Sequence, residues 1–116
     1  MKCGITGSTG TLGKVFLKKN NKIKFNKFKG DITKKSQVIK WINKNKFNYF
    51  IHLASVVPIK KVNKNFSYAK KVNFYGTKYI IDSLIKKKDP IWFFFSSSSH
   101  VYSYSNSKVS EKSILK

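Results

Sequence analysis

Four consecutive serines at positions 96–99 follow an aromatic run, WFFF, and precede a histidine, a valine and a tyrosine. Hydroxyl groups at the end of an apolar segment can be aimed at a ligand, where they orient or polarise an oxygen atom. They can also form an ordinary polar turn after a buried strand. The choice between these two interpretations depends on the rest of the chain.

Gly7, Gly10 and Gly13 are spaced three residues apart in the segment GITGSTGTLG. Small residues let the backbone approach a pyrophosphate, and the free N–H groups at a helix N-terminus point at it. The last glycine lets the helix pack closely on the strand. Glycines also form plain tight turns, but their position between an expected strand and an expected helix favours a nucleotide site.

An acidic residue about 20 positions after such a loop usually holds the ribose 2′-hydroxyl of a dinucleotide. This sequence has no Asp or Glu before Asp31, and Asn26, Lys27 and Lys29 occupy the region instead. A cation there suits a 2′-phosphate. The sequence therefore favours NADP over NAD.

The 116 residues include 25 basic and 4 acidic side chains, which gives a net charge of +21. Every basic residue is a lysine, whereas bidentate contacts to bases and phosphates are made by arginine. The lysines are also scattered along the chain. We therefore expect no specific nucleic-acid partner, and a basic nucleic-acid-binding protein is the weakest of the alternatives.

Cys3 is the only cysteine, so no intrachain disulfide is possible. It lies in an apolar run and is expected in the core. Residues 1–14 lack the apolar segment of a signal peptide, and the longest apolar run, residues 91–95, is too short to span a membrane. We expect a soluble, cytoplasmic protein without a membrane partner, and we assign no metal ligands.

Expected strands and helices alternate along the chain, which predicts an α/β fold with a parallel sheet and helices on both faces. The expected strands cover residues 2–6, 23–25, 49–53 and 91–96, with 28–32 as a candidate for a further strand. The expected helices cover residues 11–19, 34–45 and 65–88, the second of them capped by Thr33. The entire chain, 1–116, is expected to form part of one domain.

Apolar periodicity places certain residues of each expected helix on one face. The residues expected on these faces are Leu12, Val15 and Phe16, then Val38, Trp41 and Ile42, then Ala69, Asn73, Gly76, Ile80 and Leu84. A glycine inside a helix costs about 1 kcal/mol relative to alanine, so Gly76 is expected to pack closely against a neighbour. His52 is expected to be a hydrogen-bonded core residue, and His100 is given no catalytic role.

Five segments together make the chain resemble the extended short-chain dehydrogenase/reductase family: TGSTGTLG (6–13), GDI (30–32), HLAS (52–55), NFYGT (73–77) and SSSSHVY (96–102). More narrowly, the chain is similar to the NAD(P)-dependent epimerases, dehydratases and reductases of nucleotide-activated sugars, such as dTDP-4-dehydrorhamnose reductase. The resemblance implies a Rossmann-type fold, NAD or NADP as cofactor and a nucleotide-sugar substrate. It also allows a homodimer of the full-length enzyme.

The resemblance assigns roles to individual residues. Beside the glycine loop, Thr11 and Leu12 would lie at the pyrophosphate, and Asp31 and Ile32 would contact the adenine. The cofactor would pass over a wall formed by Leu53, Ala54 and Ser55, supported from the long helix by Asn73.

The resemblance also answers the question of the serines. In this family a Ser or Thr three residues before a Val-Tyr pair bonds the sugar oxygen that is oxidised or reduced. The pair is Val101 and Tyr102 here, so the position is Ser98, with Ser97 as the alternative. The family often has glycine after the pair, where this chain has Ser103.

The family's catalytic tyrosine and lysine are spaced Tyr-x-x-x-Lys on a helix, and Tyr104 and Lys108 are the only such pair here. They follow Ser98 much more closely than in the family, and the intervening serines and asparagine favour turns over helix. We therefore expect that they are not the catalytic pair. The chain is expected to be the N-terminal portion of a longer enzyme, truncated before the last strands and the substrate lobe, and inactive alone. A non-catalytic NADP-binding module is the alternative.

Overall fold

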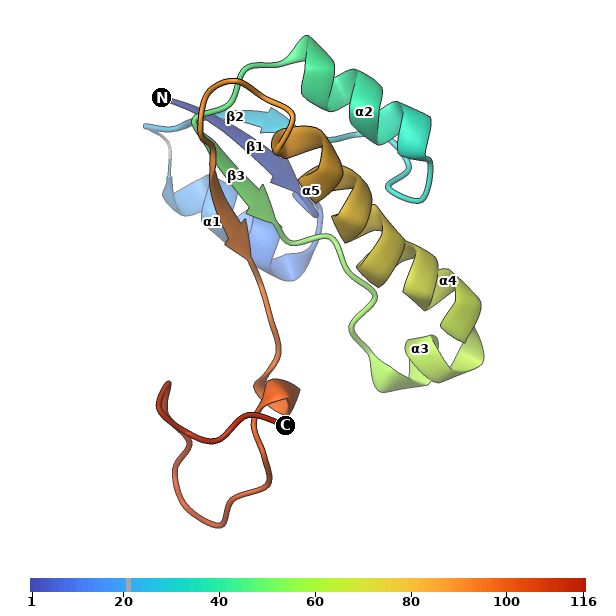
Figure 1. Ribbon diagram of the computed structural model, residues 1–116, viewed down its shortest axis with the longest axis vertical. Helices are drawn as coiled ribbons and strands as arrows, with labels where there is room; N and C mark the ends of the chain where they lie inside the picture. Colours follow the sequence, from blue (N-terminus) through green and yellow to red (C-terminus); the bar gives the residue numbers. More distant parts are fainter. Residues whose placement is uncertain (21) are drawn as a thin grey trace.

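The computed structural model of this chain describes residues 1–20 and 22–116, and it contains a four-stranded sheet with helices packed against it (Figure 1). The strands are β1 (Lys2–Thr6), β2 (Lys24–Lys27), β3 (Tyr49–His52) and β4 (Trp92–Phe95). Their order is β2-β1-β3-β4, and every neighbouring pair is parallel. This confirms the predicted α/β class with a Rossmann-type sheet.

The helical segments all lie between two strands in the sequence, except for the last. They are α1 (Thr11–Lys19), α2 (Lys35–Lys44), α3 (Ile59–Lys64), α4 (Phe66–Lys70), the π-helical segment η1 (Lys71–Gly76), α5 (Thr77–Leu84) and the short 3-10 turn η2 (Ser99–Val101). In Figure 1, α1 lies on one side of the sheet, and α2 and α5 lie on the other. Among the described residues, no helix is long and apolar enough to cross a membrane.

The two sheet faces carry cores of different size, because side chains alternate between faces along each strand. Phe50 faces α2 and α5 and belongs to a large cluster that includes Val38, Ile42 and Ile80. Its neighbour Ile51 faces α1 and packs in a smaller cluster with Cys3 and Ile5, as expected for Cys3. Burial raises the pKa of the Cys3 thiol to about 11, so this group is uncharged at neutral pH.

Apolar surface remains open where β4 borders α1. Trp92 and Phe94 are 57% and 42% exposed, and Leu12 and Val15 of α1 are also exposed. Together with Phe16 these side chains line an apolar groove. The expected sheet covered on both sides is therefore found over β1 and β3 but not over β4, which is an edge strand.

The structure corrects two predictions in the segment after β2. Residues 28–32 form no strand: Phe28 N–H donates to the Ile5 carbonyl, and the chain then turns. The Asp31 carboxylate accepts from both the N–H and the hydroxyl of Thr33, a local turn typical of aspartate. Thr33 therefore does not cap α2, whose N-cap is Lys34.

The expected long helix at residues 65–88 consists of shorter pieces. Asn65 caps α4 by accepting a hydrogen bond from Tyr68 N–H, and α5 ends at Leu84 before a turn. Helix α3, which follows Pro58, was not expected from the apolar pattern. Gly76 is buried, and a Cβ there would lie 3.0 Å from Ile32 Cγ1, which confirms the close packing expected at this glycine.

Candidate functional site

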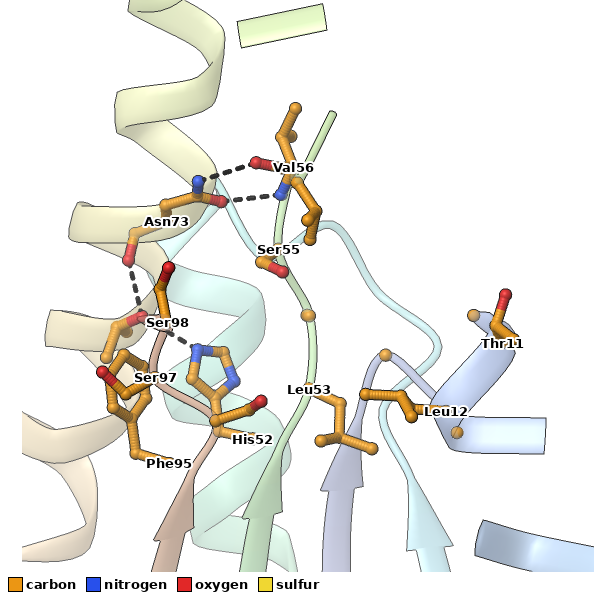
Figure 2. A pocket seen from close by; sticks show the side chains of 17 residues that line it. Thr11, Leu12, His52, Leu53, Ser55, Val56, Asn73, Phe95, Ser97 and Ser98 are labelled. Atoms are coloured by element: carbon orange, nitrogen blue, oxygen red, sulfur yellow. Dashed lines mark hydrogen bonds between the residues drawn. The ribbon is translucent and has the colours of Figure 1, made fainter. Parts of the chain in front are cut away.

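A cavity of about 780 Å³ lies at the carboxyl ends of β1, β3 and β4. The strand order reverses beside β1, because β2 pairs with one edge of β1 and β3 pairs with the other. In an open parallel sheet, ligands bind at the carboxyl ends of the strands at such a point. The lining residues are Gly7, Gly10, Thr11, Leu12, Gly13, His52, Leu53, Ala54, Ser55, Val56, Val57, Asn73, Thr77, Phe95, Ser96, Ser97 and Ser98. Figure 2 shows how several of these side chains surround the opening.

The glycine loop forms one side of the cavity and requires glycine at two of its three positions. Gly7 has φ of +72°, and a Cβ there would lie 2.5 Å from the carbonyl carbon of Leu53. A Cβ at Gly13 would overlap the Gly7 carbonyl oxygen. Gly10 differs, since a Cβ there would meet only that same oxygen at 3.4 Å, an ordinary contact. The loop is thus held against the end of β3 by backbone contact.

Helix α1 begins at this loop with its N-terminus at the cavity. Its N-cap is Gly10, which supplies no side-chain hydrogen bond, and its first turn contains no acidic residue. The first N–H groups of a helix lack intrahelical partners and carry partial positive charge, so they favour an anion. Thr11 and Leu12 of this turn line the cavity, so a phosphate fits here in both space and charge.

The second side of the cavity is a wall formed by residues 53–56, which continue from β3 without regular secondary structure and contact the glycine loop at Gly7. Asn73 in η1 holds this wall through both ends of its side-chain amide. Val56 N–H donates to Asn73 Oδ1 at 2.7 Å, and Asn73 Nδ2 donates to the Val56 carbonyl at 3.0 Å (Figure 2). Leu53, Ala54 and Ser55 lie along the cavity between this anchor and the sheet.

The floor of the cavity contains His52, which is 3% exposed. Its Nδ1 lies 2.6 Å from Thr6 Oγ1, and its Nε2 lies 2.8 Å from Thr77 Oγ1. Burial lowers the pKa of His52 to about 4. The expectation of a hydrogen-bonded core histidine is confirmed. Thr6 and Thr77 were not singled out from the sequence, although Thr77 ends the NFYGT segment.

The serines after β4 form the third side. Ser96, Ser97 and Ser98 all line the cavity and are exposed. Ser98 Oγ lies 2.9 Å from His100 Nδ1 and accepts from the His100 backbone N–H at 3.2 Å, a contact that the sequence did not indicate. Hydroxyls from this segment therefore share one cavity with the glycine loop.

Not every residue that the sequence suggested lies at this cavity. Asp31 and Ile32 are absent from its lining; Ile32 is buried in the core beneath Gly76. The hydrogen bonds from Thr33 lower the pKa of the exposed Asp31. The contact of Asp31 and Ile32 with adenine stays a prediction.

Tyr104 and Lys108 behave as the sequence indicated. The described residues 102–116 contain no helix, and Tyr104 is 89% exposed. The two side chains therefore do not share a helical face, which the Tyr-x-x-x-Lys arrangement requires.

Residues 5–115 match the family model described as GDP-mannose 4,6 dehydratase. Among curated protein sequences, none matches this chain significantly. Among solved structures, a dTDP-4-dehydrorhamnose reductase from Clostridium acetobutylicum is 23% identical with a TM-score of 0.86, covering 100% of this chain and 43% of the reductase.

Two further solved structures carry a cofactor. UDP-glucose 4-epimerase from Thermus thermophilus, in complex with NAD, is 13% identical with a TM-score of 0.81, covering 100% of this chain and 44% of the epimerase. RMD from Pseudomonas aeruginosa, complexed with NADPH, is 17% identical with a TM-score of 0.82, covering 99% of this chain and 41% of that protein. At these identities the likeness shows the fold, and this chain spans less than half the length of each structure.

Proposed function

Because this chain belongs to the GDP-mannose 4,6 dehydratase family, we propose that it binds NAD or NADP in the cavity at the carboxyl ends of β1, β3 and β4. The cofactor supplies hydride transfer when bound. The chain's role is then that of the cofactor-binding part of an epimerase, dehydratase or reductase that acts on a nucleotide-activated sugar.

The observation that carries this proposal is the shared cavity. The N-terminus of α1 offers N–H groups without intrahelical partners for a pyrophosphate, and residues 53–56 provide a wall beside it, with small side chains at Ala54 and Ser55. The serine segment lies on the same cavity, where a hydroxyl could meet a substrate oxygen. Its volume of about 780 Å³ is in the range of small-molecule sites.

We propose NADP as the preferred cofactor. Lys27 is the last residue of β2, where it pairs with Ile5 of β1, and Lys29 follows two residues later; both side chains are exposed. A 2′-phosphate near the end of β2 would meet positive charge there. The similar structures include complexes with NAD and complexes with NADP or NADPH, so the preference rests on these lysines alone.

Ser98 is our candidate for the hydroxyl that contacts the sugar oxygen. Serine can orient and polarise that oxygen, but the proton needs a group whose pKa is tuned near working pH, a contribution of roughly 10²–10⁴-fold. Tyr104 and Lys108 are not on one helix and are not proposed for this step. We therefore propose that the 116-residue chain binds cofactor without catalysing turnover.

The cofactor site is tested by titrating NADPH and NADH against the chain and against Gly10→Asp and Gly10→Asn. Gly10 is the N-cap of α1, where Asp and Asn are both favoured, and a Cβ fits there, so both variants should fold. Gly10→Asn adds bulk alone, whereas Gly10→Asp adds bulk and negative charge. We expect NADPH to bind more tightly than NADH, Gly10→Asn to bind it weakly and Gly10→Asp not measurably. Equal binding by all three proteins would refute the site.

A further inference from the structure

Among the described residues that line the cavity, His52 is the only one with an acid-base side chain. Its ring packs against Phe93 and Phe95 of the neighbouring strand β4, with centroid distances of 6.3 and 6.0 Å. An aromatic hydrocarbon ring would satisfy this packing. What distinguishes histidine at this position is that both ring nitrogens are hydrogen-bonded, one to β1 and one to α5.

For a neutral imidazole, which carries one ring hydrogen, the contacts allow only one arrangement of hydrogens. The Thr77 hydroxyl donates its single hydrogen to the Asn73 carbonyl at 2.7 Å, so Thr77 Oγ1 must accept from His52 Nε2–H. Nδ1 then carries no hydrogen and accepts from the Thr6 hydroxyl. Thr6 Oγ1 in turn accepts from Ala54 N–H at 3.4 Å. In the opposite tautomer, Thr77 would need two hydrogens.

The series of hydrogen bonds through Thr6, His52 and Thr77 reaches the cavity wall at both of its ends. At one end Thr6 holds Ala54, and at the other end Asn73 holds Val56 through its amide. The glycine loop touches the same wall, since Gly7 packs against the backbone of Leu53 and Ala54. Fixing the wall therefore fixes the distance between it and the N-terminus of α1.

We propose that His52 is a positioning residue for the dinucleotide, locked by Thr6 and Thr77 as the neutral Nε2–H tautomer so that residues 53–56 keep the shape of the cofactor site. The positioning role rests on the proposed cofactor function. His52 does not touch the reacting atoms and acts through the wall. Its pKa of about 4, lowered by burial, agrees with a neutral ring at neutral pH.

The tautomer is tested without cofactor by recording imidazole nitrogen resonances of the labelled 116-residue chain at neutral pH. The only other histidine is His100, so a His100→Gln variant assigns the signals. We expect a protonated Nε2 and an unprotonated Nδ1 at His52, unchanged in the His100→Gln variant. A protonated Nδ1, a charged ring or a rapidly exchanging mixture of tautomers would overturn the proposal.

The positioning role is tested with a matched pair at Thr77, because Thr77→Ser keeps the hydroxyl and Thr77→Val removes it at nearly constant volume. Without this hydroxyl the wall keeps its binding-competent shape only part of the time, and a populated fraction of about one fifth lowers the affinity about fivefold. We expect Thr77→Val to bind NADPH about fivefold more weakly and to lose the single tautomer, and Thr77→Ser to match the wild-type chain in both. Thermal unfolding shows whether each variant is folded.

If Thr77→Val does not fold, Thr6→Val and Thr6→Ser provide the same comparison at the other ring nitrogen. Equal NADPH affinity of a folded valine variant and its serine partner would overturn the positioning role. If the wild-type chain binds no NADPH at all, the proposed cofactor function fails and the positioning role fails with it. The imidazole resonances would still decide the tautomer in that case.

Discussion

The side-chain amide of Asn73 forms two hydrogen bonds with the backbone of one residue, Val56, at 2.7 and 3.0 Å. Val56 lies beyond the end of β3 at His52, so these bonds hold a segment that does not belong to the sheet. Both partners lie on segments that border the cavity. The anchor therefore links the helical layer to the proposed cofactor wall.

Replacing Asn73 should weaken this link. Asn73→Leu removes both hydrogen bonds, and we expect a loss of about 1–2 kcal/mol in the free energy of unfolding because each bond contributes about 1 kcal/mol and the site is partly solvated. Asn73→Asp retains the acceptor for Val56 N–H but places a negative charge against the Val56 carbonyl. Urea unfolding measures both variants, and unchanged stability in both would contradict the anchor.

The glycine loop gives a second matched comparison. At Gly7 the positive φ and the contact with Leu53 both oppose a side chain, so we expect Gly7→Ala to cost about 1–3 kcal/mol or more. At Gly10 a Cβ fits, so Gly10→Ala should change stability by less than about 1 kcal/mol. Thermal unfolding of the two alanine variants tests this difference. Similar unfolding temperatures would show that the loop is not packed against the wall as described.

The stability of the chain should fall as the pH is lowered through the range in which His52 is neutral when folded and charged when unfolded. Burial lowers its pKa to about 4 in the folded chain, whereas an unfolded histidine titrates at about 6.5. The unfolded state binds more protons between these values. The contribution of His52 is therefore present above about pH 6.5 and is lost on acidification toward about pH 4, by roughly 3 kcal/mol.

Urea unfolding at a series of pH values measures this dependence. His52→Phe retains the ring stacking but cannot titrate, so its stability should change much less over the same range. The lowered pKa of Asp31 acts at more acidic pH, because an aspartate contributes above its unfolded pKa of about 4. Equal pH dependence in the wild-type chain and His52→Phe would exclude a buried neutral His52.

The sequence predicted the elements whose patterns are local. Periodicity together with the glycine spacing gave the bounds of β1 and α1 as they are found. The sequence also offers residues 28–32 as a candidate strand, which the structure does not contain. The turn that Asp31 forms with Thr33 decides this segment instead.

The polar contacts of the cavity floor could not be predicted from the sequence in the same way. Thr6, His52 and Thr77 are far apart in the chain, and only the parallel pairing of β1 and β3 with α5 above them brings the three together. Asn73 was identified from its place in the helical stripe and from the family resemblance, but not its partner Val56. Distances between elements depend on packing, which residue patterns do not encode.

The most direct measurement of the central claim is to add NADP⁺ to the isotope-labelled 116-residue chain and follow the backbone amide resonances. We expect the largest shifts at Gly10, Thr11 and Leu12 and along residues 53–56, with little change at Trp92 and Phe94 in the open apolar groove. Gly10→Asp should abolish these shifts. An absence of shifts at saturating NADP⁺, or shifts confined to residues outside the cavity, would contradict the assignment of this cavity as a dinucleotide site.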